Sequence, residues 1–156
     1  TLFRSALENF TKHIIHIVNS EYNEVYPIND RSYSINKTTL EKVINERIKE
    51  NFKQLSKEIN GKMEREYRIL SGLSHSLTPE SINNTLNYFF DLRNVNDENV
   101  SLVLGKLKEV CMLIFSLLVI LCEPSFKLWN KDELENILLI VFGRRKTSSY
   151  INKIKT

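Results

Sequence analysis

Apolar residues recur at helical spacing from the first residues of the chain onward. Between residues 2 and 20 they come at alternating steps of four and three positions, which places them on one face of an α-helix. This stripe consists of Phe3, Leu7, Phe10, Ile14 and Ile17. The pattern therefore predicts an amphipathic helix over residues 2–20 that packs this face against the rest of the protein.

The next stretch, residues 21–37, shows no such period. It holds three tyrosines, Tyr22, Tyr26 and Tyr33, interspersed with Asn29, Asp30 and Ser32. Pro27 breaks any local helix. We therefore expect a long loop over residues 21–37, and loops of this length inside a compact domain are often functional.

A second amphipathic helix follows this loop. Thr38 is followed three residues later by Glu41, so that each side chain can accept a hydrogen bond from the backbone N–H of the other. Apolar residues then recur at helical spacing until the pattern stops near Gly72. Gly61 lies within this stripe and costs about 1 kcal/mol relative to Ala, which makes it the candidate for a kink or break.

Two further helices are marked by their caps. Thr78 and Pro79 begin a helix that ends near Asn94, because Pro fits the first helical position. Asn130 caps the last helix, and Gly143 is suited to end it.

The most apolar part of the chain is the run over residues 110–122, in which Ser116 is the only polar residue. It belongs to a helix that begins around Asn96 and ends before Pro124. The run is too short to cross a membrane, which takes about 20 residues. We therefore expect a helix buried on all sides by its neighbours, and no membrane span.

Composition supports the same fold class. Only four glycines and three prolines occur among 156 residues, which is few for the many tight turns of an all-β domain. The sequence therefore predicts an all-α bundle of about five helices around a central apolar helix, residues 100–123. We expect one domain over residues 1–143, followed by a basic C-terminal tail over residues 144–156.

The predicted tail carries the clearest charge asymmetry. The chain has a formal net charge of +3, whereas residues 144–156 contain five cations and no acid. Such a tail can bind phosphate, an anionic membrane or an acidic partner, or it can be a solvated terminus. Tyr150 offers a ring on which a base can stack. The candidate nucleic-acid-binding residues are Arg144, Arg145, Lys146, Lys153 and Lys155.

The cysteines and histidines form no recognisable site. Cys111 and Cys122 lie about 16 Å apart along a straight helix, which is too far for a disulfide. Their apolar surroundings predict two buried free thiols and a reducing, intracellular compartment, either cytoplasmic or nuclear. His13 and His16 are three positions apart, but no carboxylate completes a metal-binding spacing. We therefore expect no metal and no cofactor.

One pair of residues resembles the signature of a known family. Arg68 is followed by six residues and then by His75, at the end of a predicted helix. This arrangement resembles the arginine–histidine signature of HEPN-type ribonucleases, which are all-α bundles of about this size. The resemblance implies a dimer cleft in which Arg68 holds an RNA phosphate while His75 moves a proton. Ile69 stands where that family usually has a polar residue.

The predicted architecture is also similar to a Bcl-2-type bundle, whose groove holds a partner helix. The chain has no Gly-rich phosphate loop and no HExxH or GxSxG motif, which favours a non-enzymatic interaction or assembly module. Its partner is expected to be another protein or a second copy of the chain, with RNA or another polyanion contacted by the basic residues. The HEPN-like ribonuclease and the Bcl-2-like groove protein remain as alternatives.

Overall fold

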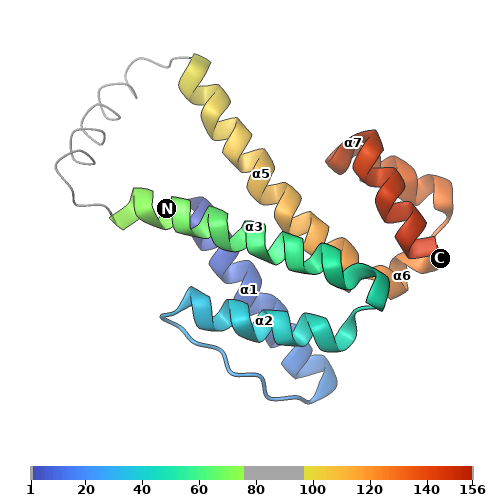
Figure 1. Cartoon of the computed structure of the whole chain (residues 1–156), viewed down its shortest axis with the longest axis horizontal. Coiled ribbons are helices and arrows are strands. Elements are labelled where there is room, and N and C mark those ends of the chain that lie inside the picture. The colour runs from blue at the N-terminus through green and yellow to red at the C-terminus, as the bar shows by residue number, and fades with distance from the viewer. Residues whose placement is uncertain (1, 76–96, 156) are drawn as a thin grey trace.

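The computed structural model describes residues 2–75 and 97–155, which form α-helices joined by short connections (Figure 1). These residues contain no strand, which confirms the predicted all-α bundle. The helix predicted to begin at Thr78 lies outside the described residues. None of the described helices is both long enough and apolar enough to cross a membrane. The helices are α1 (Leu2–Tyr22), α2 (Tyr33–Arg47), α3 (Glu50–His75), α5 (Asp97–Leu121), α6 (Glu123–Lys127) and α7 (Lys131–Lys155).

The core forms where these helices meet α5. Helix α5 packs against α1, α3, α6 and α7, while α1, α2 and α3 pack against one another. In Figure 1, α5 passes between the group α1–α3 and α7. Burial of each large apolar side chain contributes roughly 1.5–3 kcal/mol before the entropy cost of folding is counted. The largest fully buried apolar side chains are Leu7, Ile15, Leu40, Ile44, Phe52, Met63, Leu117, Leu134 and Ile154.

The two halves of α5 differ in burial. Residues 110–121 are all buried or half-buried except Phe115, which is 45% exposed. The prediction that this apolar run is sheltered by other helices is therefore confirmed for residues 110–121 apart from Phe115, whereas Cys122 at the end of the run is exposed. The centre of the bundle is this second half of α5 and not the whole of residues 100–123. The first half instead exposes apolar side chains, among them Val100, Val103, Leu104 and Leu107.

The loop between α1 and α2 is shorter than the sequence predicts. It spans residues 23–32 instead of 21–37, because α2 already begins at Tyr33. Ser32 caps α2, since its hydroxyl oxygen accepts a hydrogen bond from a backbone N–H of the first turn. The capping box predicted at Thr38 therefore lies inside the helix.

Two asparagines hold this loop against the helices. The side chain of Asn36 accepts a hydrogen bond from the N–H of Asn29 at 2.7 Å and donates to its carbonyl at 2.6 Å. Asn19 makes the same pair of bonds with the backbone of Tyr26. Tyr33 is buried, and its ring stacks on a tyrosine ring of α3. Tyr33 therefore belongs to the core and not to the loop in which the sequence places it.

The stripe predicted as one helix over residues 38–72 is broken, but not at Gly61. Ile48 has an extended backbone (φ −89°, ψ 152°) and separates α2 from α3, whereas Gly61 lies inside α3. The break places Lys49 where its ammonium donates to the carboxylate of Glu123 at 2.6 Å. Because the Glu123 side chain is only 4% exposed, this ion pair fixes the α2–α3 turn to the start of α6.

Residues 144–155, predicted as part of a basic tail, form the second half of α7. Gly143 (φ 70°, ψ 168°) produces a kink, so the residue predicted to end the helix changes its direction instead. Beyond the kink the helix buries four side chains, at Thr147, Tyr150, Ile151 and Ile154. The segment is therefore part of the core and not a separate tail.

We predict opposite effects for alanine at two glycines. An added Cβ at Gly143 meets no atom within 4 Å, but its φ and ψ belong to a region that only glycine adopts readily. Gly143→Ala should therefore lower the free energy of unfolding by about 1–3 kcal/mol. Gly61 has the same open space and a helical backbone, so Gly61→Ala should raise it by about 0.5–1 kcal/mol. Urea unfolding followed by circular dichroism measures both, and stabilisation by Gly143→Ala would contradict the kink.

Candidate polyanion-binding cleft

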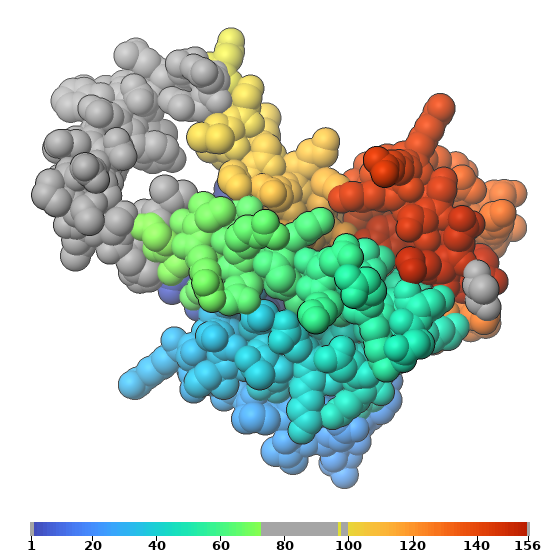
Figure 2. Space-filling view, viewed as in Figure 1, coloured from blue at the N-terminus to red at the C-terminus, as the bar shows by residue number. Residues whose placement is uncertain are grey.

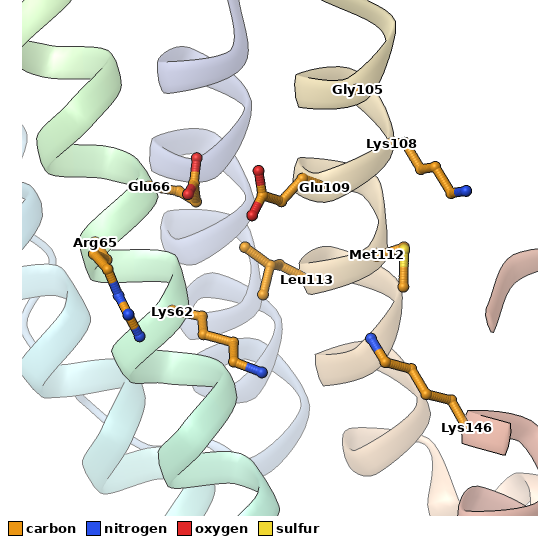
Figure 3. A pocket seen from close by; sticks show the side chains of 9 residues that line it. All are labelled: Lys62, Arg65, Glu66, Gly105, Lys108, Glu109, Met112, Leu113 and Lys146. Carbon is orange, nitrogen blue, oxygen red and sulfur yellow. The ribbon is translucent and has the colours of Figure 1, made fainter. Parts of the chain in front are cut away.

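A cleft of about 430 Å³ lies where α3, α5 and α7 meet. Figure 2 shows the three helices meeting on one face of the molecule, and Figure 3 shows the side chains around the cleft. Helices α3 and α5 each present one face to it, because their lining residues are spaced mostly three and four positions apart. The lining consists of Lys62, Arg65, Glu66, Gly105, Lys108, Glu109, Met112, Leu113 and Lys146.

Four of the lining residues are cations. Lys62 and Arg65 come from α3, Lys108 comes from α5, and Lys146 comes from the second half of α7. All four are exposed, and none forms an ion pair with a residue that the structure describes. In Figure 3 the ammonium groups of Lys62 and Lys146 extend toward each other from two sides of the cleft. Their charges are therefore available to an anionic ligand.

Lys106 lies beside the cleft and forms ion pairs with both carboxylates of the cleft lining. Its ammonium donates to Glu66 and to Glu109, at 2.9 Å in each case. These hydrogen bonds raise the pKa of Lys106 above its ordinary value of 10.5. The contribution of Lys106 to stability is therefore complete at neutral pH and is lost only as the pH rises through that raised pKa. Because Glu66 is buried, its ion pair with Lys106 also fixes α3 to α5.

The remaining lining residues are apolar side chains and one glycine. Leu113 is buried and Met112 is half-buried, so these two side chains form an apolar floor. Gly105 leaves the rim open, because a Cβ there would meet no atom within 4 Å. The nine lining residues include no histidine, cysteine, hydroxyl or amide side chain, and the two carboxylates are already bonded to Lys106. The cleft is therefore equipped to bind an anion through charge.

The five residues predicted to bind nucleic acid are placed in three different ways. Lys146 lines the cleft, whereas Arg144 and Arg145 are exposed just before it on α7. Lys153 donates to a backbone carbonyl in the first turn of α3 at 2.7 Å. Lys155 donates to three backbone carbonyls at and just after the end of α6. The last two cations therefore hold helices together.

Two other side chains are not placed as the sequence predicts. Tyr150, predicted as a ring for stacking bases, is only 4% exposed and packs against Phe142. Cys122, predicted as a buried thiol, is exposed, whereas Cys111 is half-buried. Desolvation and the carboxylate of Glu21 raise the pKa of the Cys122 thiol. This thiol therefore stays protonated and weakly nucleophilic at neutral pH.

Arg68 and His75, the pair that resembles the ribonuclease signature, lie near the end of α3. Arg68 is exposed and forms an ion pair with Glu64, one turn earlier. It does not line the cleft. The side chain of His75 lies outside the described residues. The ribonuclease alternative therefore stays a prediction.

His13 and His16 lie at a second hollow of about 620 Å³ on α1, together with Asp30 from the loop. Metal sites in proteins generally use three or more protein ligands. Within residues 2–75 and 97–155, no three His, Cys, Asp or Glu side chains gather closely enough to hold a metal ion. This hollow therefore offers no metal centre.

Sequence reasoning identified Lys146 but missed Lys62, Arg65 and Lys108. The spacing of Lys62 and Arg65, three positions apart on α3, is a local sign that their charges share a helix face. No local pattern connects that face to Lys108 or Lys146. Only the packing of α3 and α7 around α5 brings the four cations together.

The chain has no significant match to any protein-family model, curated protein or solved structure.

We predict that Lys106 stabilises the fold and that its neighbour Lys108 does not. Lys106→Met leaves the buried carboxylate of Glu66 without its cation, which should lower the free energy of unfolding by about 1–3 kcal/mol. Lys108→Met removes an exposed cation that forms no ion pair with a described residue, so its effect should stay within about 0.5 kcal/mol. Urea unfolding at neutral pH tests both variants. Equal stabilities would show that the Lys106–Glu66 pair does not hold α3 to α5.

Proposed function

We propose that the protein is a non-enzymatic module that binds RNA at the basic cleft between α3, α5 and α7. The observation that carries this proposal is the set of four exposed cations, from three helices, that have no ion pair with any described residue. The chain's own carboxylates at the cleft, Glu66 and Glu109, are held by Lys106. They therefore leave the four cations to an external anion.

Binding of this kind has a characteristic salt dependence. Cations that contact phosphates release counterions from the nucleic acid, so affinity falls as salt rises. For a single strand the logarithm of the binding constant falls by about 0.7 per phosphate contact for each tenfold rise in salt. Four contacts then weaken binding by about 50-fold between 50 mM and 200 mM salt.

We predict that RNA affinity depends on Lys62 and Lys146 and not on charge elsewhere on α3. Lys62→Ala or Lys146→Ala should weaken binding of a labelled oligouridylate about three- to tenfold and reduce its salt slope by about 0.7. Lys57→Ala removes an exposed lysine of α3 that does not line the cleft, so its affinity should stay within about twofold of wild type. Fluorescence anisotropy between 50 mM and 200 mM salt measures affinity and slope.

Two results would contradict this assignment. Equal losses of RNA affinity in the Lys57 variant and the cleft variants would show that binding depends on the overall charge of the protein and not on the cleft. No binding at 50 mM salt would remove the RNA-binding function itself. The same samples also test the alternative, because cleavage of the RNA that disappears in His75→Ala would support the ribonuclease.

A second candidate function is self-association through the first half of α5. Val100, Val103, Leu104 and Leu107 recur at helical spacing and expose between 41% and 56% of their surface. Exposed apolar surface on one helix face is typical of protein–protein interfaces. A second copy of the chain presents the same surface, as a symmetric dimer requires.

We expect the mass measured by light scattering to rise toward that of a dimer as protein concentration increases. Leu104→Glu should shift the protein to the monomer, because it places a charge in the centre of this stripe. Ile140→Glu alters an apolar residue on α7 that is 87% exposed, so it should leave the mass unchanged. A monomeric mass for the wild type at every concentration would eliminate this candidate.

A further inference from the structure

We infer that two copies of the chain pack antiparallel through one exposed face of α5, with Cys111 of one copy opposite Cys111 of the other. This inference rests on the second candidate function, self-association, and names the face, the direction and the register of the pair. The observation that carries it is an apolar stripe along α5 whose spacing is symmetric about Cys111.

The apolar stripe runs along the whole length of α5. Its members recur at steps of four and three positions, so they lie within about a quarter of the helix surface. Each of them is exposed or half-buried, whereas Leu113, Leu117 and Ile120 on the opposite side of the helix are buried in the core. The stripe therefore faces away from the bundle. It consists of Val100, Leu104, Leu107, Cys111, Phe115, Leu118 and Cys122.

This stripe accounts for the two side chains that are exposed at the otherwise sheltered end of α5. Phe115 is 45% exposed, and Cys122 is exposed as well. Cys122 continues the last turn of the helix, because its N–H donates to the carbonyl of Leu118 at 2.8 Å. Both residues therefore share a face with the exposed apolar residues of the first half. A continuous exposed apolar face is typical of a helix that packs against a partner.

The stripe has the same spacing in both directions from Cys111. The steps from Val100 to Cys111 are four, three and four positions, and those from Cys111 to Cys122 are again four, three and four. In an antiparallel pair with Cys111 on the twofold axis, every stripe residue therefore meets a stripe residue of the other copy, as a self-complementary interface requires. The opposed pairs are Val100 with Cys122, Leu104 with Leu118, Leu107 with Phe115, and Cys111 with Cys111.

The shape and the dipole of α5 favour the antiparallel direction. The first half of α5 extends away from α6 and α7, which lie beside its second half (Figure 1). An antiparallel pair therefore places the slender half of each copy beside the broader half of the other. A parallel pair brings the α6 and α7 helices of both copies to the same end. The antiparallel pair also brings the partial positive charge at the start of each α5 near the partial negative charge at the end of the other.

The size of the stripe indicates a weak pair. From Val100 to Cys122 it is about 33 Å long, and a helix is about 10 Å wide, so the contact covers roughly 330 Å² on each copy. Interdigitating side chains bury more accessible area than this footprint. The pair therefore belongs with weak, transient interfaces, which bury less than about 1,200 Å² in total. A covalent cross-link is suited to trap such a pair.

The two native cysteines test both the direction and the register. Cys122→Ser leaves only Cys111, which faces its counterpart on the twofold axis, so a short bismaleimide should join two copies. Cys111→Ser leaves only Cys122, and the two Cys122 thiols then lie about 33 Å apart along the helices, so no cross-linked dimer should form. The reaction is run at mildly alkaline pH, because desolvation raises the pKa of the Cys122 thiol. Denaturing gel electrophoresis measures the cross-linked fraction.

A third thiol makes the test independent of the reactivity of Cys111. Val100→Cys in the Cys111→Ser background should restore the cross-linked dimer, because position 100 of one copy lies opposite Cys122 of the other. Lys57→Cys in the same background adds an exposed thiol on α3 and should restore nothing. Leu104→Glu added to Cys122→Ser should abolish the cross-link, because it places a charge within the stripe.

The outcomes separate this arrangement from self-association in general. Cross-links through Cys111 alone and through Cys122 alone, in equal yield, would show a parallel pair and overturn the inference. A dimeric mass by light scattering with no cross-link in either the Cys122→Ser or the Val100→Cys variant would place the interface elsewhere and overturn it too. A monomeric mass at every concentration, again without cross-links, would instead eliminate the candidate function of self-association.

Discussion

Residues 110–121 of α5 are apolar on nearly every side, and the other described helices that contact α5 pack around them. This burial requires α1 and α3 on one side of α5 and α7 on another. The Lys106–Glu66 ion pair then fixes α3 along α5, because a buried carboxylate is costly without its cation. The cleft lies at the surface of α5, between α3 and α7. Its position therefore follows from the way in which the core arranges these helices.

The end of the chain completes the cleft through the same packing. The kink at Gly143 turns the second half of α7 back toward the core, where Tyr150 and neighbouring apolar side chains are buried. Lys153 and Lys155 fix this half to α3 and to the end of α6 through backbone carbonyls. Lys146 lies near the start of the same segment, just after the kink, and is thereby held at the cleft. Basic residues that look alike in the sequence thus act either in packing or at the surface.

Sequence patterns predicted those features that depend on local spacing. The helices α1 and α5 and the cap at Asn130 follow from periodicity and capping chemistry, and Asn130 does accept hydrogen bonds from the first turn of α7. The start of α2 was missed because the bonds between Asn29 and Asn36 form only in the folded loop. The break at Ile48 was missed because no Gly or Pro marks it, and the partner of the adjacent Lys49 is a distant carboxylate in α6. For the same reason the sequence indicated one cation of the cleft and not the whole set.

We propose that helices brought together by the core of α5 form one binding site for RNA. Amide chemical-shift mapping by NMR, during titration with oligouridylate at low salt, tests it most directly. The largest shifts should fall together on residues 62–66, 105–109 and 144–148, and those of α1 and α2 should be small. Shifts concentrated on α1 and α2, or confined to only one of those three segments, would contradict it.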